Sequence, residues 1–99
     1  MKHKVDFGRA IKFVREKKGL NQEQLGNKVD SNQPYISQIE RGVFNPSIKF
    51  IEKICKALNI PFVFMVWHSM TEENISEEKR EAFKMLKPSI DNIFNDLLK

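Results

Sequence analysis

The chain has 99 residues, of which 40% are hydrophobic and 30% are charged. This length predicts one globular domain, with a core that needs neither a metal nor a disulfide to form. The longest apolar run, residues 61–67, is much shorter than the ~20 residues that a membrane helix needs, and the first six residues do not begin a signal peptide. We therefore expect a cytoplasmic protein without a membrane segment.

The charge is unevenly distributed along the chain. Residues 1–60 hold twelve Lys and Arg against six Asp and Glu, a net charge of +6, whereas residues 61–99 hold five against seven, a net charge of −2. A basic N-terminal part favours contact with a polyanion such as nucleic acid. Charge alone does not identify that partner, because many basic surfaces bind nothing.

Apolar residues recur at spacings of three and four, which predicts an all-α fold. The first helix is expected over about residues 6–18 and ends at Gly19, where a left-handed residue costs least. The second is expected over about residues 22–29. Asn21 is its predicted N-cap, and Gln24 can complete a capping box.

The third helix is expected over about residues 33–41, because Pro34 fits only the first turn of a helix and Gly42 stops the pattern. The fourth is expected over about residues 47–58. Either Asn45 or Ser47 caps it.

The segment 61–67 is ambiguous, since its proline suits a helix start and its β-branched and aromatic residues suit a strand. We favour a short fifth helix. A helical pattern returns from Ser76 to the C-terminus and is interrupted by Pro88, which predicts a kink or two consecutive helices. The expected division is a domain of residues 5–68 and a C-terminal helical extension of residues 69–99.

The second and third helices are joined by three residues, and their inward positions 25, 29, 36 and 39 predict a compact helix-turn-helix. The segments 19–25, 35–42 and 45–47 resemble the Cro/C1-type (XRE) helix-turn-helix family. The resemblance covers residues 5–60 without a gap. It implies a lambda-repressor-like five-helix DNA-binding domain, whose third helix enters the major groove of double-stranded DNA.

By the same resemblance, the protein is a sequence-specific transcriptional regulator, expected to repress as a homodimer on an operator. Carried over by position, the base contacts are Gln33, Pro34 and Gln38. Glutamine offers a donor and an acceptor together, as adenine recognition requires, whereas Pro34 offers only apolar contact. The DNA backbone contacts are expected from Arg15, Asn21, Gln22, Tyr35, Ser37, Arg41 and Asn45, with backbone amides around Val43 and Asn45.

Three positions depart from the family pattern, which usually has Thr or Ser at Asn21, Ala at Gly26 and Gly at Asp30. Asparagine caps a helix equally well, glycine fits a close helix crossing, and aspartate tolerates a left-handed turn. None of these departures breaks the motif.

Three side-chain roles follow from the resemblance. Arg15 and Glu40 match a pair that links the first helix to the recognition helix, and Gln22 can brace Gln33. Tyr35 either contacts phosphate or packs its ring against the second helix, and the residues leave both readings open.

The C-terminal third carries apolar residues at spacings of 3, 4, 3 and 4, as in a coiled-coil seam. This stripe either packs on residues 62–67 of the same chain or forms a dimer interface, which we favour. The interface residues are then Phe83, Leu86, Ile90, Ile93, Phe94 and Leu97. Two rival functions remain: an antitoxin whose C-terminal third grips a toxin, and a helical protein-interaction module without DNA binding.

Other chemistry is not indicated. His3, His68 and Cys55 lack the spacing of zinc ligands, and Cys55 lies on an apolar helix face, as a core thiol does. No phosphate-binding glycine loop is present. We expect no metal, no cofactor and no enzymatic activity.

Overall fold

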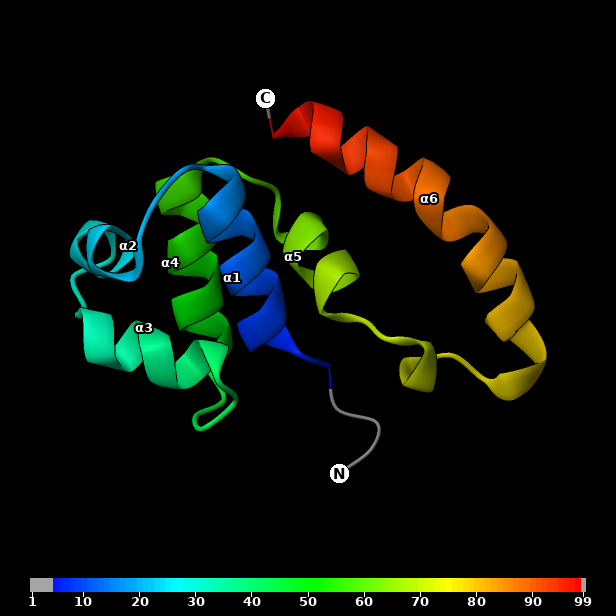
Figure 1. Cartoon of the computed structure of the whole chain (residues 1–99), viewed down its shortest axis with the longest axis horizontal. Helices are drawn as coiled ribbons and strands as arrows, with labels where there is room; N and C mark the ends of the chain where they lie inside the picture. Colours follow the sequence, from blue (N-terminus) through cyan, green and yellow to red (C-terminus); the bar gives the residue numbers. More distant parts are fainter. Residues whose placement is uncertain (1–4, 99) are drawn as a thin grey trace.

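The computed structural model describes residues 5–98, so that His3 lies outside the described part. The chain forms α1 (Phe7–Lys17), α2 (Gln22–Lys28), α3 (Gln33–Glu40), α4 (Ile48–Leu58) and α5 (Phe62–Ser69) (Figure 1). Two 3-10 turns, η1 (Glu72–Asn74) and η2 (Glu77–Lys79), lead into α6 (Arg80–Leu97). Residues 5–98 contain no strand, and the predicted all-α class is confirmed.

Four helices begin at side-chain caps. At α2 the box is complete, since Asn21 Oδ1 accepts from the Gln24 backbone N–H at 2.7 Å and Gln24 Oε1 accepts from the Asn21 N–H at 2.8 Å. Ser47, and not Asn45, caps α4 by accepting from the backbone N–H of Phe50 at 3.1 Å. The remaining caps are Asp6 and Asn32. The cap residues therefore determine where these helices begin.

The core is formed where α1 packs against α3 and α5, with α2 and α4 completing the body. Its fully buried side chains include Ile11, Val14, Leu25, Ile36, Ile39, Ile51, Ile54, Phe64 and Met65. Cys55 is buried among them, as predicted, and burial raises the pKa of its thiol to about 11. Within residues 5–98 no three His, Cys, Asp or Glu side chains gather so as to hold a metal ion.

The segment after Pro61 is helical, so the strand alternative is wrong. Phe64 and Met65, adjacent in sequence, are both fully buried, which a half-exposed strand with alternating faces does not allow. α5 packs against α1 and α4 on one side and meets α6 on another. A helix covered on several sides is apolar on several faces, which explains its sequence.

α6 is one continuous helix through Pro88, so the predicted split into two helices is wrong. Proline lacks an N–H and leaves the Lys84 carbonyl without its helical partner. Both residues are exposed, so that water can bond this carbonyl. Figure 1 shows α6 curving along the α5 side of the molecule, far from α2 and α3. No helix in residues 5–98 has the length and apolar character to cross a membrane.

Candidate nucleic-acid interface

The turn between α2 and α3 is tight. Asp30 has φ 56°, the left-handed conformation expected there, and the Ser31 backbone N–H donates to the Gly26 carbonyl at 2.7 Å. A Cβ on Gly26 would lie 2.8 Å from the backbone carbonyl carbon of Asn32, closer than any real Cβ contact. An alanine here, which the family pattern usually has, would therefore have to displace the Asn32 backbone.

A second glycine sets the angle between α1 and α3. The backbone carbonyl oxygen of Ile39 occupies the space that a Cβ on Gly8 would need. This contact brings the C-terminal half of α3 directly onto α1. Sequence reasoning missed Gly8, although a glycine inside a helical pattern was an available signal of close backbone approach.

Arg15 and Glu40 form a nearly buried ion pair that joins α1 to α3. Arg15 Nε donates to Glu40 Oε2 at 2.7 Å and Nη2 donates to Oε1 at 3.0 Å, with 9% and 3% of the two side chains exposed. Arg15 Nη1 also donates to the Leu20 carbonyl at 2.8 Å. The hydrogen bond to Glu40 raises the pKa of Arg15 despite burial. All three guanidinium nitrogens of Arg15 therefore donate to groups inside the protein and stabilise the fold.

The pair extends into a network that reaches the start of α3. Gln22 Nε2 donates to Glu40 Oε1 at 3.0 Å, and Gln22 Oε1 accepts from Gln33 Nε2 at 2.8 Å. The chain of bonds Arg15–Glu40–Gln22–Gln33 thus connects α1, both ends of α3 and the beginning of α2. We call it the polar clasp. It fixes the orientation of α2 on α3 and orients the Gln33 amide.

The predicted base-contact residues differ in exposure. Gln33 and Pro34 are exposed at the first turn of α3, whereas Gln38, one turn further on, is half-buried. Among the predicted backbone contacts, three further side chains are exposed, namely Asn21, Arg41 and Asn45. Gln22, Tyr35 and Ser37 are half-buried beside them.

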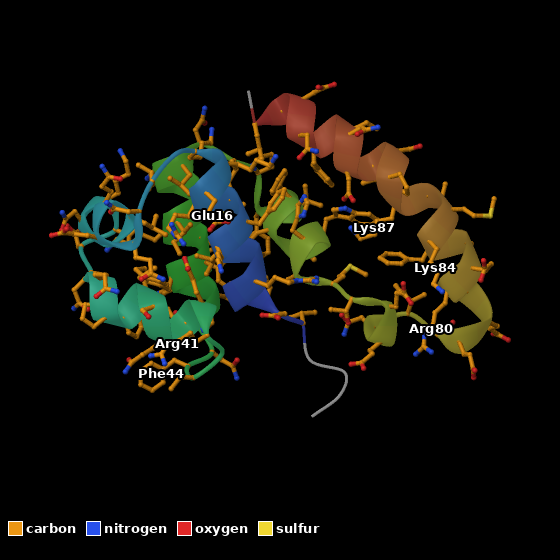
Figure 2. The ribbon with its side chains drawn as sticks, viewed as in Figure 1. Glu16, Arg41, Phe44, Arg80, Lys84 and Lys87 are labelled. Carbon is orange, nitrogen blue, oxygen red and sulfur yellow. The ribbon has the colours of Figure 1, made fainter. Side chains whose placement is uncertain are left out.

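Tyr35 packs on two aromatic neighbours. Its ring meets Phe50 of α4 edge-on, with ring centroids 5.4 Å apart, and Phe44 of the following loop at 6.0 Å. The aromatic partners of Tyr35 thus lie on α4 and in the loop, and its packing against α2, which has no aromatic residue, stays a prediction. Figure 2 shows Arg41 and Phe44 close together where α3 ends.

The loop after α3 is held by backbone hydrogen bonds. The Val43 N–H donates to the Gln38 carbonyl at 2.8 Å, and the Phe44 N–H reaches the same oxygen at 3.4 Å. The Val43 amide, which was expected to hold phosphate, thus already has an acceptor inside the protein. Its function here is to satisfy an open carbonyl at the end of α3.

The apolar stripe of α6 divides into two faces. Phe83 is 9% exposed and contacts Trp67 of α5 at 5.4 Å, and Phe94 contacts Phe64 at 5.0 Å, again measured between ring centroids. Both pack inside the subunit, so their assignment to an interface between copies is corrected. The outward face keeps Leu86, Ile93 and Leu97 exposed, with Ile90 half-buried.

Comparison with known proteins places this geometry in context. A family model described as helix-turn-helix matches residues 11–65, which contain α2 and α3. The immunity repressor protein of Bacillus phage phi105 is 32% identical over 87 residues, covering 82% of this chain and 60% of the repressor. The control protein C.BamHI of Bacillus amyloliquefaciens is 44% identical over 55 residues, covering 54% of this chain and 68% of the control protein.

A solved structure is also similar. The crystal structure of the restriction-modification controller protein C.AhdI from Aeromonas hydrophila matches with a TM-score of 0.57 and 34% identity. The match covers 62% of this chain and 92% of the controller chain. The likeness thus spans most of that protein but leaves more than a third of this one unmatched.

Proposed function

This chain belongs to the helix-turn-helix family, and on that premise we propose that it is a transcriptional regulator that binds a specific duplex DNA sequence with α3 in the major groove. The relatives described above are named as a repressor and as control proteins. The chain spans 60% of the phage repressor, so the role of a whole repressor is proposed here and not transferred. The mechanism is occupancy of an operator, without a chemical step.

The polar clasp is the observation that carries the proposal. Gln33 spends one amide N–H on Gln22, so its second N–H and its Oε1 remain for a base. Those two groups match N7 and the N6 amino group of adenine. The side chain is exposed and already oriented, so binding a base costs little further ordering. Pro34, beside it, suits the methyl group of thymine.

Phosphate contacts position α3 on the duplex. The side-chain amide nitrogen of Asn21, Nδ2, remains available for phosphate, because only the side-chain oxygen Oδ1 caps α2. Arg41, exposed at the end of α3, supplies a cation at the other side of the groove. The remaining contacts proposed to phosphate come from Gln22, Tyr35, Ser37, Asn45 and the small exposed part of Arg15.

We assign pairing of two copies to the outward face of α6. Leu86, Ile93 and Leu97 are 58%, 61% and 57% exposed and follow each other along one face. An unpartnered apolar face of this kind marks an interaction site. Residues 69–99 then pair the subunits while residues 5–68 bind DNA. A dimer would place two copies of α3 in successive major grooves about 34 Å apart.

Selection of bound oligonucleotides from a random duplex pool tests the proposal, followed by affinity measurements on the selected site. Gln33→Ala should weaken binding by ~1–3 kcal/mol and relax the preference at one base pair. Asn92→Ala, an exposed change on α6, is the control and should leave affinity unchanged. Equal loss for Gln33→Ala on selected and scrambled duplexes would contradict base recognition.

Salt dependence tests the phosphate contacts separately. Arg41→Ala should weaken binding to all duplexes alike and reduce the slope of log affinity against log salt by about one unit. Negligible affinity for any duplex at ~50 mM salt would overturn DNA binding and favour a protein-interaction module.

Sedimentation equilibrium tests the pairing. Ile93→Asp should convert dimers to monomers, because it places a charge in the proposed interface. Met85→Asp is the matched control, since Met85 is 75% exposed on a different face of the same helix, and it should remain dimeric. A wild-type chain that sediments as a monomer at micromolar concentration would refute the pairing. Co-purification of a toxin on this face would instead support the antitoxin alternative.

A further inference from the structure

A pocket lies between α1, α5 and α6, on the side of the molecule away from α2 and α3. Its volume is about 290 Å³, close to the lower end of the range for small-molecule sites. The lining residues are Arg9, Phe13, His68, Lys87, Asp91 and Asn95. None of the six takes part in the proposed DNA contacts or in the proposed pairing of subunits.

The pocket carries an excess of positive charge. Arg9 comes from α1, where its Nη2 donates to the carbonyls of His68 and Met70 at 3.3 and 3.0 Å. Lys87 comes from α6 and donates to Asp91 Oδ2 at 2.8 Å. Because Arg has five N–H donors and Lys has three, both cations keep donors beyond these bonds. The lining of the pocket thus holds two cations and one carboxylate.

That carboxylate is already satisfied. Asp91 accepts from Lys87 through Oδ2 and from the indole N–H of Trp67 through Oδ1 at 2.8 Å. Burial opposes its charge, but these two hydrogen bonds lower the pKa of Asp91 overall. An anion entering the pocket therefore meets a spare cation, and the acid beside it remains tied to its own partners.

One wall of the pocket is aromatic. The rings of Phe13 and His68 stack on each other with centroids 4.5 Å apart and an interplanar angle of 20°, and the centroid of the Phe64 ring lies 4.4 Å from that of the same His68 ring. Burial, with Lys87 and Arg9 adding to it, lowers the pKa of His68 against the opposing effect of Asp91, so the imidazole is neutral at pH 7. An aromatic group of a ligand can pack edge-to-face against this stack.

Two polar atoms beside this wall lack partners. His68 Nε2 and Asn95 Oδ1 are both buried and make no hydrogen bond within the described chain. Buried polar atoms nearly always have a partner, which is protein, water or ligand. Both orphan atoms belong to residues that line the same pocket. Asn95 Oδ1 can only accept, so its partner is water or an N–H or O–H of a ligand and not the anionic group itself.

We infer that this pocket binds a small organic anion, in which a carboxylate or phosphate is attached to a flat apolar body. The anionic group lies between Arg9 and Lys87, and the flat body lies against Phe13 and His68. Such a ligand joins α1 to α6, so it binds only while α6 is docked and thereby favours the docked state. If the outward face of α6 pairs two copies, as proposed above, such a ligand would also influence that pairing. This consequence rests on the proposed function, whereas ligand binding itself does not.

The single tryptophan of the chain provides the readout, because Trp67 contacts the Asp91 side chain in the pocket wall. The full chain is titrated with phenyl phosphate, benzoate and inorganic phosphate, up to concentrations that saturate a site with a Kd of about 1 mM. A saturable change in Trp67 emission is expected with an aromatic anion. Inorganic phosphate should bind about tenfold more weakly, because it lacks the flat body. The ratio of phenyl phosphate to benzoate distinguishes a phosphate from a carboxylate site.

Two lysines of α6 provide matched variants. Lys87→Ala should weaken binding about tenfold or more, through loss of a charged hydrogen bond. Lys84→Ala removes an equal charge one turn away, where Lys84 pairs with Glu72 at 3.7 Å, and should leave binding unchanged (Figure 2). Amide shifts of the wild-type chain, measured by NMR, should be largest for the lining residues.

Three results would overturn the inference: no saturable change with either aromatic anion, equal loss in both lysine variants, or shifts spread over the basic surface of α2 and α3. The affinity for the selected duplex is measured in parallel without ligand. If that affinity is absent while an aromatic anion binds at the pocket, the proposed function fails and this inference stands.

Discussion

The helix pair α2–α3 and the helix α6 are attached to the body by different kinds of contact. The pair is fixed by the polar clasp, by two glycines that allow backbones to touch, and by core side chains with no exposed surface. α6 is attached by a row of rings and one indole hydrogen bond, and its other apolar face stays open. The α2–α3 pair is thus held by buried polar and backbone contacts, whereas α6 is held mainly by aromatic packing on one of its faces.

This difference matches the roles proposed for the two regions. A helix that reads base edges has to be held within a fraction of an ångström, because hydrogen bonds to bases depend steeply on distance and angle. A helix that pairs subunits or responds to a ligand gains from a second accessible state. Regions of low local stability are where such motions occur.

The largest expected effect comes from opening the polar clasp. Glu40→Ala should lower the free energy of unfolding by ~3–5 kcal/mol, because it leaves the buried Arg15 guanidinium without its partner. Glu16→Ala is the control, since Glu16 lies 3.9 Å from the same arginine but its side chain is 59% exposed, and it should cost less than ~1 kcal/mol. Urea denaturation measures both. An equally small loss of unfolding free energy in both variants would show that the Arg15–Glu40 pair contributes little to the stability of the fold.

Gly26→Ala tests the close backbone contact beneath the turn. The added methyl group must displace the Asn32 backbone, which should destabilise the fold by ~1–3 kcal/mol. DNA affinity should fall as well, because α2 and α3 are moved apart. Asn27→Ala, on the exposed side of α2, should change neither quantity. Unchanged DNA affinity in a destabilised Gly26→Ala protein would show that DNA binding does not depend on the exact spacing of α2 and α3.

Phe83→Ala tests whether α6 detaches separately from the body. Loss of the contact with Trp67 should shift the Trp67 emission towards that of exposed indole, while global stability changes by less than ~1 kcal/mol. Leu86→Ala alters the outward face of the same helix and should leave the emission unchanged. A large loss of global stability in Phe83→Ala would instead make α6 part of one cooperative unit.

The smallest effect is a dependence of α6 docking on pH. Burial above all, with Lys87 and Arg9 adding to it, lowers the pKa of His68 in the folded chain. At a pH just below the usual histidine pKa of about 6.5, the unfolded chain therefore binds more protons than the folded chain does. The free energy of unfolding then falls as the pH drops through that region.

His68→Gln should flatten the pH profile of the Trp67 emission between about pH 7.5 and 5.5, the window in which the unfolded histidine titrates. His3 is present in both proteins, so its titration cancels in the comparison. A profile with the same slope in both proteins would exclude His68 as the group responsible.

The sequence was sufficient for the helices up to Leu58, because caps such as Asn21 and left-handed residues such as Asp30 act locally. The Arg15–Glu40 pair came only from the family resemblance, since nothing local indicates that residues 25 positions apart meet. Likewise, the close contact that a Cβ at position 26 would make depends on the path of the Asn32 backbone. That path exists only once the turn has formed.

The C-terminal third was harder to predict, for a physical reason. The apolar spacing of α6 correctly predicted a helix. The apolar stripe of that helix is wide enough, however, for one side of it to pack on α5 while the other side stays exposed. Only the packing of Phe83 on Trp67 shows which half faces inward. Pro88 was predicted to cause a kink or to separate two consecutive helices; α6 is a single helix, and the exposed position of Pro88 lets water bond the carbonyl that the proline leaves open.

The buried thiol of Cys55 has a practical consequence. With a pKa of about 11 and almost no exposed surface, it forms very little thiolate at neutral pH and resists maleimide reagents and mild oxidants. A cysteine introduced on α3 and another on α6 can therefore carry a donor and acceptor dye pair without removing the native residue. Energy transfer between the dyes would then record the docking of α6, molecule by molecule.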